Sequence, residues 1–170
     1  MHAFGGKYNY PIAINQENIL KSITYDLEGN FPPAMEYLQK SLAVNQKLGN
    51  KSGISECHIV IGVLYNEQGN YPRALEHYTK ALVVDEEIGN KGGMSMSLNN
   101  IGNIYFIQGD YLNALENYEK SLAIDQELGV KQGITTALSN IGNINNNFRE
   151  YYSRIGISSK GSVDLRRTWR

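Results

Sequence analysis

The sequence predicts an all-α fold in which antiparallel helix pairs stack side by side as an α-solenoid. The first observation behind this prediction is a block of forty residues that recurs without insertion or deletion, so that 51–90 aligns with 91–130. The second is a helical spacing of apolar residues, three or four positions apart, inside each block. A fixed period of roughly 20 to 50 residues is typical of repeat proteins, in which each unit buries its apolar face only against its neighbours.

The repeat is clearest at small and aromatic positions. Glycines, alanines and tyrosines recur forty positions later, and a further partial copy begins at 131. Small residues let two helices cross closely, and tyrosines fill the space around the crossing. The positions that we expect to carry this packing are Gly62, Tyr65, Ala74, Tyr78, Gly102, Tyr105, Ala114, Tyr118 and Gly142.

Each block contains two helical segments with a break between them. In 91–130 the first segment carries Leu98, Ile101 and Tyr105 on one face, and a Gly-Asp pair then interrupts it. The second segment shows the same spacing from position 111 onward and ends at Gly129. Glycine at that place is a helix stop, because it adopts the left-handed conformation at little cost.

These residues resemble the tetratricopeptide repeat, whose signature places an apolar residue, a glycine and a tyrosine on the first helix and an alanine and an aromatic residue on the second. The resemblance covers about residues 15–151 and implies a right-handed superhelix of helix pairs. The common unit has roughly 34 residues and a closing proline, whereas Glu86 and Gln126 occupy that place here. The forty-residue type is similar to the repeats of kinesin light chains and of bacterial signalling proteins.

We expect six segments along the chain. They are an irregular lead-in at 1–14, a degenerate first repeat at 15–50, full repeats at 51–90 and 91–130, the first helix of a truncated fourth repeat at 131–151, and a non-repeat basic tail at 152–170. With no second helix to cover it, the truncated repeat would expose Leu138, Ile141 and Ile144. Such an end predicts fraying or self-association.

The tail has no helical spacing and no counterpart in the other copies. One permitted back-translation of 153–169, read one nucleotide later, gives LALEYHQKALLIYEELG, which matches the second repeat helix RALEHYTKALVVDEEIG at 73–89. We therefore interpret 152–170 as a frameshift product, arising in the gene or in its sequencing, of a longer parent protein. The alternative is a genuine basic tail in which Arg166, Arg167 and Trp169 contact a partner.

Charge and hydropathy argue against several classes of function. Residues before Arg149 carry 10 basic and 15 acidic side chains, so the repeats lack the basic face that nucleic acids require. No segment approaches the roughly 20 apolar residues of a membrane span, and no signal peptide is recognisable. Cys57 is the single cysteine and forms no internal disulfide. We expect a cytoplasmic protein with no nucleic-acid or membrane partner.

Residues suited to catalysis are sparse, so we expect no enzyme, no cofactor and no metal site. Cys57 and His58 are adjacent and would point about 100° apart on a helix, a poor geometry for a nucleophile and its base. His58 falls at a packing position, whereas His77 and Asp85 fall on faces that we expect to be solvated. No cluster of histidine, cysteine and carboxylate residues has metal-ligand spacing.

Asparagines gather on the first helices of the last two copies. The resemblance implies that this face is concave and holds ligands. Because an amide side chain both donates and accepts hydrogen bonds, a row of asparagines can bind the backbone of an extended peptide. Alternatively, asparagine is merely tolerated on an exposed helix face. The candidate peptide-binding residues are Asn99, Asn100, Asn103, Phe106, Asn140, Asn143 and Asn147.

The function that we expect is a non-catalytic scaffold that binds an extended peptide or a partner protein along the concave face. One alternative is the sensory or regulatory array of a longer signalling enzyme, such as a histidine kinase. Another is a decayed gene whose product has no function. A clamp for a terminal carboxylate is not expected, because 55–68 and 95–108 contain no lysine or arginine.

Overall fold

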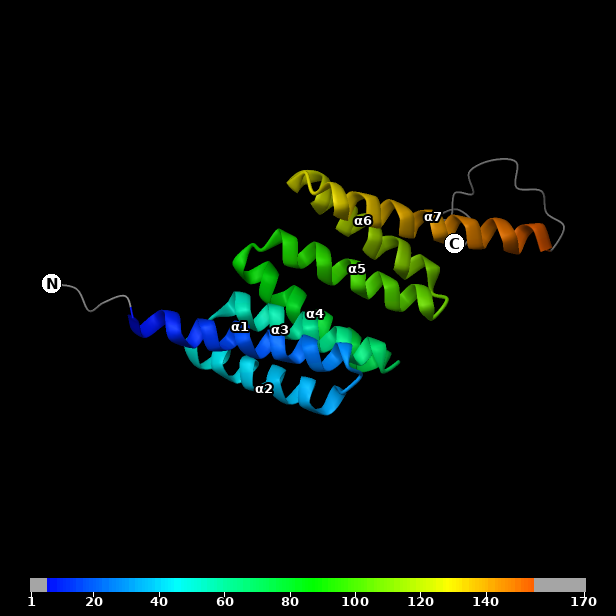
Figure 1. Cartoon of the computed structure of the whole chain (residues 1–170). Coiled ribbons are helices and arrows are strands. Elements are labelled where there is room, and N and C mark those ends of the chain that lie inside the picture. The colour runs from blue at the N-terminus through cyan, green and yellow to red at the C-terminus, as the bar shows by residue number, and fades with distance from the viewer. Residues whose placement is uncertain (1–5, 155–170) are drawn as a thin grey trace. The chain divides into compact units, whose positions relative to one another are not determined.

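The chain folds into a series of α-helices (Figure 1). The computed structural model describes residues 6–154, with side chains from Glu17 to Arg149, and all regular secondary structure in that range is α-helical. The predicted all-α fold class is confirmed. The helices are α1 (Gly6–Leu27), α2 (Phe31–Leu48), α3 (Lys51–Glu67), α4 (Tyr71–Ile88), α5 (Lys91–Ile107), α6 (Tyr111–Leu128) and α7 (Lys131–Arg154).

Short loops end one helix and start the next. At Gly89 the backbone is left-handed, with φ of 68°, and the following N–H of Asn90 donates to the carbonyl of Asp85 at 2.9 Å. At the start of α6 the side chain of Asp110 accepts a hydrogen bond from the Asn113 N–H at 3.2 Å. These caps satisfy backbone groups that a helix end leaves without partners. They allow a reversal of the chain within a few residues, so consecutive helices form hairpins.

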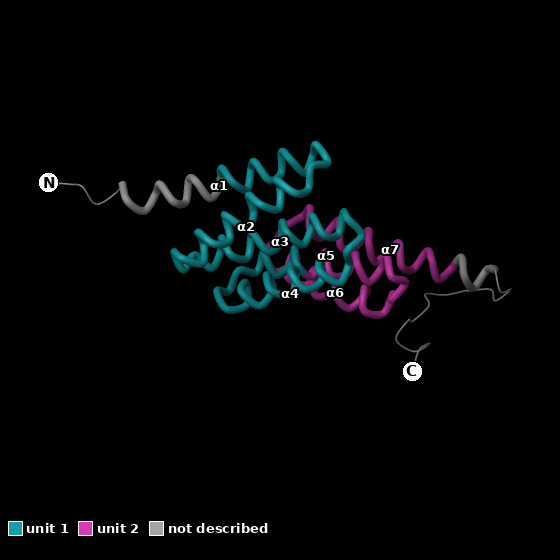
Figure 2. Tube along the Cα trace, turned by 90° about the horizontal axis from the view of Figure 1, so that it is seen from below, with its two compact units in different colours: residues 1–97 teal, residues 98–170 magenta. Residues whose placement is uncertain are grey.

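The chain divides into two compact units, residues up to Ser97 and residues from Leu98 (Figure 2). Each unit has its own buried apolar cluster. In the first unit the cluster includes Leu38 on α2 and Ile61 on α3, both at most 2% exposed. In the second unit it includes Tyr118 on α6 and Ile144 on α7.

Two helix pairs pack through a glycine on the first helix and a tyrosine on the second. A Cβ atom added at Gly62 on α3 would lie 2.6 Å from the ring of Tyr78 on α4. A Cβ atom added at Gly102 on α5 would lie 2.7 Å from the ring of Tyr118 on α6. Any larger residue at these glycines would therefore push the paired helix away.

The expectation of an irregular segment at 1–14 is wrong for residues 6–14, because α1 begins at Gly6. This segment lacks a helical spacing of apolar residues and contains Pro11. Adding residues to an existing helix costs much less free energy than starting a new helix, so α1 can extend through it. Residues 1–5 lie outside the described part of the chain. So do residues 155–170, which make up most of the predicted basic tail, whereas α7 continues to Arg154.

The predicted exposure of the last helix is correct for Leu138 and wrong for Ile144. Leu138 is 53% exposed, whereas Ile144 is 0% exposed and packs in the same cluster as Ala114 and Tyr118. The reason is that Ile144 faces the preceding α6, so it needs no following helix to cover it. Ile141 lies between these extremes and is partly buried against that cluster.

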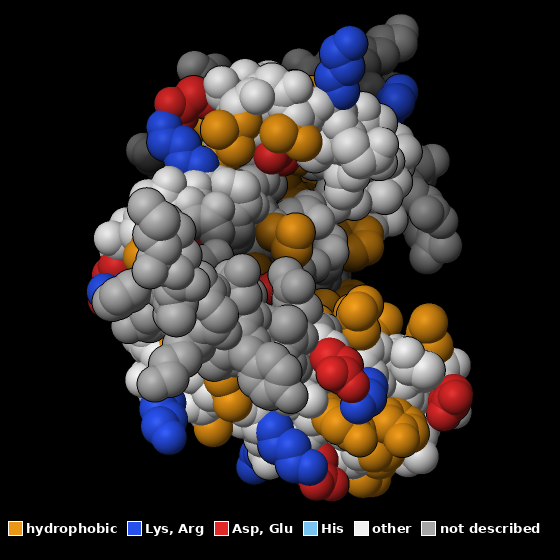
Figure 3. Space-filling view, turned by 60° about the vertical axis from the view of Figure 1, so that its left-hand side comes forward, with side chains coloured by type: hydrophobic (Ala, Val, Ile, Leu, Met, Phe, Trp, Pro, Cys, Tyr) orange, Lys and Arg blue, Asp and Glu red, His pale blue; other side chains and the backbone are white. Residues whose placement is uncertain are grey.

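On the face that Figure 3 shows, apolar side chains lie beside charged ones. Leu20 and Leu27 on α1 are the most exposed large apolar residues of the described chain, at 65% and 84%. Within residues 6–154, none of the helices combines the length and the hydropathy needed to cross a membrane.

Candidate functional site

Three asparagines from α5 and α7 join in one hydrogen-bonded row. The Nδ2 of Asn140 on α7 donates to the Oδ1 atoms of Asn99, at 3.0 Å, and of Asn103, at 3.3 Å. The Oδ1 of Asn103 also accepts from the Tyr118 hydroxyl on α6 at 2.8 Å. Since an amide oxygen accepts and an amide nitrogen donates, these bonds orient all three amides. The row is thus already ordered without a ligand.

The remaining candidate residues lie around this row in different environments. Asn100 and Asn147 are partly buried, and Asn143 is exposed. Phe106 contributes to the apolar cluster of the second unit, where its ring centroid lies 5.5 Å from that of Tyr111. Phe106 therefore has a packing role on α5 in addition to the ligand contact predicted for it.

The helices that carry the row are almost free of charge. Between 92 and 107 on α5, and between 132 and 148 on α7, the sequence contains no acidic or basic residue and no histidine. Burial raises the pKa of Tyr118 to about 12, so its hydroxyl stays a neutral donor to Asn103. The row can therefore offer hydrogen bonds but neither an acid nor a base for catalysis near neutral pH.

Two histidines form a contact that the sequence did not predict. His58 on α3 is 9% exposed, and its Nδ1 lies 3.1 Å from the Nδ1 of His77 on α4. The expectation that His77 is solvated is wrong, because its side chain is partly buried. The register of the helix pair could have revealed this contact, because His77 precedes Tyr78, the tyrosine that packs on Gly62. The next copy has Leu98 in the place of His58.

The expectation that Asp85 lies on a solvated face is wrong. Asp85 is 0% exposed, and its carboxylate accepts from the Ser55 hydroxyl at 2.6 Å and from the Nδ2 of Asn90 at 2.8 Å. A buried carboxylate is tolerated only with such partners. Its carboxylate also lies where a Cβ atom at Gly93 would be, which explains the glycine there.

A similar set of hydrogen bonds recurs at the junction between α2 and α3, where Asn45 takes the place of Asp85 and Asn50 that of Asn90. The Nδ2 of Asn50 donates to the Oδ1 of Asn45 at 2.8 Å, and the Oδ1 of Asn50 accepts from the Gly53 N–H at 3.2 Å. An asparagine thus bridges the end of one helix pair to the start of the next. At the junction between α6 and α7, Val130 stands in that place and has no amide to form the bridge.

Cys57 belongs to this buried polar region and is not poised for chemistry. Its side chain is 0% exposed, and the Nδ2 of Asn45 donates to its Sγ at 3.5 Å. Burial raises the pKa of the thiol, with hydrogen bonds from Ser41 and Asn45 opposing the rise. A buried, protonated thiol is a poor nucleophile. Among the described residues, no three histidine, cysteine or carboxylate side chains lie close enough to hold a metal ion.

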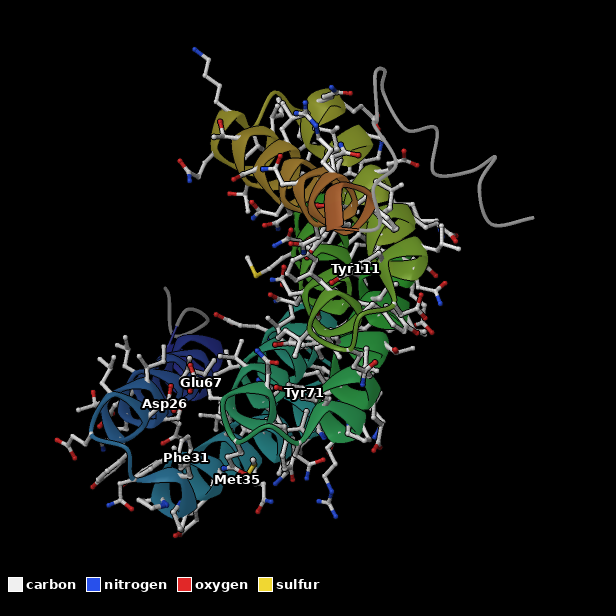
Figure 4. The ribbon with its side chains drawn as sticks, turned by 90° about the vertical axis from the view of Figure 1, so that its right-hand side faces the viewer. Asp26, Phe31, Met35, Glu67, Tyr71 and Tyr111 are labelled. Carbon is white, nitrogen blue, oxygen red and sulfur yellow. The ribbon has the colours of Figure 1, made fainter. Side chains whose placement is uncertain are left out.

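An acidic pair lies on the first helices of the first unit. Asp26 on α1 and Glu67 on α3 lie next to each other (Figure 4) and share a hydrogen bond. Partial burial raises the pKa of Glu67, and the hydrogen bond and the charge of Asp26 act in the same direction. Because the sequence places these two acids 41 positions apart, their contact follows from the forty-residue stacking of α1 and α3.

Hairpins of helices with glycine–tyrosine crossings define the class of helical-repeat proteins. The family model of the tetratricopeptide repeat matches residues 19–87 and 93–148, and the chain belongs to this family. The predicted resemblance is thus confirmed. This repeat is typically a non-catalytic scaffold for interactions between proteins. No curated protein sequence matches the chain.

Solved structures share the fold, among them the following two. The crystal structure of BtubC (BKLC) from P. vanneervenii is 20% identical, with a TM-score of 0.69, and the match covers 86% of this chain and 58% of that one. Aspartyl phosphate phosphatase F from Bacillus subtilis is 16% identical, with a TM-score of 0.71 and coverage of 86% and 42%. The chain thus spans about half the length of either protein.

Proposed function

We propose that the chain is a non-catalytic scaffold that binds an extended segment of a partner protein on the first helices of the second unit. The observation that carries this proposal is the hydrogen-bonded row of Asn99, Asn103 and Asn140. With their oxygens engaged, Asn99 and Asn103 retain Nδ2 donors, while Asn140 retains its oxygen as an acceptor. Alternating donors and acceptors match the N–H and C=O groups of an extended backbone.

The orientation of the row supports binding at low entropic cost. Ordering a rotamer-rich side chain on binding costs about 0.5–1.5 kcal/mol, and a preformed row avoids part of that cost. The neighbouring candidates Asn100, Asn143 and Asn147 extend the same chemistry along α5 and α7. The absence of charged side chains from 92–107 and 132–148 favours recognition of the backbone over recognition of charged side chains.

A displayed library of random peptides tests the proposal with the full chain as bait. We expect peptides to be enriched. The double variant Asn99→Ala with Asn140→Ala should weaken their binding about threefold to tenfold, because it removes one or two hydrogen bonds to the peptide. Asn117→Ala on α6 is the matched control and should bind as wild type does. If no peptide is enriched, or if the double variant keeps its helicity and binds equally well, the proposal is wrong.

A second candidate is a regulatory repeat array of a longer signalling enzyme. The likeness to aspartyl phosphate phosphatase F, of which this chain covers 42%, favours it. Sequencing the encoding DNA through codons 140–170 and beyond tests this candidate. An enzyme domain downstream in the shifted frame would support it, whereas scattered stop codons would contradict it and indicate a decayed gene.

A further inference from the structure

The first helices of the first unit carry apolar residues where those of the second unit carry the asparagine row. Ile23 on α1 and Val60 on α3 stand eighty residues before Asn103 and Asn140, which are hydrogen-bonded to each other in the second unit. Ile23 is 40% exposed, and Val60 is partly buried. The same repeat positions therefore carry amides in one unit and aliphatic side chains in the other.

Leu27, one turn after Ile23 on α1, extends this apolar surface and is 84% exposed. The equivalent residues of the next two copies, Glu67 and Ile107, are exposed too. The exposure of Leu27 is thus a property of its position in the repeat and does not depend on which helix precedes α1. The four aliphatic residues of this surface, which we call the α1–α3 face, are Ile23, Leu27, Val60 and Val63.

An acidic pair borders the α1–α3 face. Asp26 and Glu67, which share a hydrogen bond (Figure 4), lie in the last turns of α1 and α3. Because the C-terminal end of a helix carries partial negative charge, both helix ends add to the negative potential of the two acids. The surrounding segments 22–30 and 52–72 contain four acidic residues and neither lysine nor arginine.

No cation of the described chain forms an ion pair with these two acids. Lys21 on α1 pairs with Glu17 at 2.7 Å, and Arg73 at the start of α4 donates to the Tyr65 hydroxyl at 3.0 Å. The Oδ1 of Asp26 is buried, and no described group donates a hydrogen bond to it. A buried acceptor without a donor costs free energy, so a cationic ligand that donates hydrogen bonds is favoured at this place.

We propose that the α1–α3 face binds a segment of a partner protein that carries an arginine flanked by apolar side chains, with the guanidinium at Asp26 and Glu67. Charge complementarity with the acidic pair selects a basic side chain. The planar guanidinium presents five N–H donors in a fixed fork, which suits two neighbouring carboxylates better than the compact ammonium of lysine. Leu27 and the other aliphatic residues contact the flanking apolar side chains and the arginine stem.

This inference goes beyond the function proposed above. The α1–α3 face lies in the first unit, shares no residue with the asparagine row of the second unit, and recognises side chains instead of backbone. Each surface is therefore open to a separate test.

A displayed library of short peptides tests the proposal with the full chain as bait. The central position of each peptide is arginine, glutamine or glutamate, and the flanking positions are random. We expect enrichment of arginine peptides with apolar flanks. The same selection on the variant Asn99→Ala with Asn140→Ala should enrich the same peptides, so a failure of the asparagine row would leave this result unchanged. No enrichment, or enrichment without a preference for arginine, would overturn the proposal.

Fluorescence anisotropy with one enriched peptide isolates the charge. Replacing its arginine with citrulline, a neutral residue of nearly the same shape, should weaken binding to the wild-type chain about tenfold, because a hydrogen bond between charged groups is lost. The variant Asp26→Asn with Glu67→Gln should bind the two peptides equally. The matched control is Glu28→Gln with Glu56→Gln, which removes two exposed acids from the same segments and should bind as wild type does. Equal binding of both peptides to the wild-type chain would contradict the role of the acidic pair.

Leu27→Ser tests the apolar contact. Since Leu27 is 84% exposed, the change should leave the urea midpoint unchanged, yet weaken binding of the arginine peptide about threefold to tenfold through lost apolar burial. Leu48→Ser, at the end of α2, is the control and should bind as wild type does. Self-association of the chain that Asp26→Asn with Glu67→Gln abolishes would also overturn the proposal, because a second copy would then be the occupant.

Discussion

Acidification is expected to destabilise the chain through the two histidines that face each other between α3 and α4. The Nδ1 atoms of His58 and His77 are 3.1 Å apart, which leaves room for one proton between them. Burial is the main cause that lowers the pKa of His58 to about 4, and the charges of His77 and Lys80 add to it. Burial also lowers the pKa of His77, where the charge of Glu76 opposes the effect. Arg73 contributes in the same direction as burial there.

The direction of these shifts fixes the sign of the pH effect. As the pH falls below about 6.5, His58 takes up a proton in the unfolded chain but stays neutral in the folded chain until about pH 4. The unfolded state then binds more protons, so the free energy of unfolding falls with the pH. The full shift corresponds to about 3 kcal/mol. At about pH 5, and discounting for solvent screening, we expect a loss of about 1–2 kcal/mol.

Urea unfolding followed by far-UV circular dichroism measures this loss. Between about pH 7 and about pH 5 the wild-type midpoint should fall by roughly 0.5–1 M, given a usual slope near 2 kcal/mol per molar. The control is the double variant His58→Leu with His77→Asn, which installs the residues that the next copy carries as Leu98 and Asn117. Its midpoint should fall less. Equal shifts in the wild type and the double variant would refute the reasoning.

Three further predictions concern the polar junctions. Gly93→Ala should lower the free energy of unfolding by about 1–3 kcal/mol, because its Cβ would overlap the Asp85 carboxylate. Gly92→Ala should raise it by about 0.5–1 kcal/mol, because its Cβ would meet only the Oδ1 of Asn90 at 3.8 Å, an ordinary van der Waals contact; chemical denaturation of both variants checks this. Asp85→Ala should cost about 2–4 kcal/mol by leaving the buried Ser55 hydroxyl and the partly buried Asn90 amide without their acceptor. Asp85→Asn, which matches Asn45 of the preceding copy, should cost less, and a cost for alanine no larger than for asparagine would contradict this. Cys57 should react with a thiol reagent at mildly alkaline pH only after urea is added, and fast labelling of the folded chain would show that burial does not raise its pKa.

The fold class and the family could be predicted because the repeat acts through local rules. Glycine at 49, 89 and 129 ends a helix with a left-handed residue whatever surrounds it. Glycine and tyrosine at matching places of consecutive helices mark their crossing. Neither inference needs a contact between residues that lie far apart in the sequence.

The buried polar contacts could not be predicted in the same way. Asp85 is one of three consecutive acidic residues, a pattern usual for solvated faces, and its partner Ser55 lies 30 positions earlier. Only the packing of α3 on α4 brings the two together. The contact between His58 and His77 has the same origin. The sequence did not predict the start of α1, because the spacing of apolar residues indicates only the part of a helix that is buried. A helix can extend beyond the residues that it buries.

The candidate site was predicted by residue type and face, and its peptide-binding role stays a prediction. What the sequence did not show is that Asn140 reaches both Asn99 and Asn103. That contact turns separate amides into an ordered row. Equivalent positions forty residues apart predict which side chains lie near each other, but not which rotamers their hydrogen bonds select.

The junctions between helix pairs differ in the side chain that connects them. Asn50 and Asn90 each connect two helix pairs through a side chain that both donates and accepts, whereas Val130 cannot. The junction between α6 and α7 therefore lacks the contribution of that side-chain bridge to the free energy of unfolding, which is about 0.5–1.5 kcal/mol for a typical hydrogen bond.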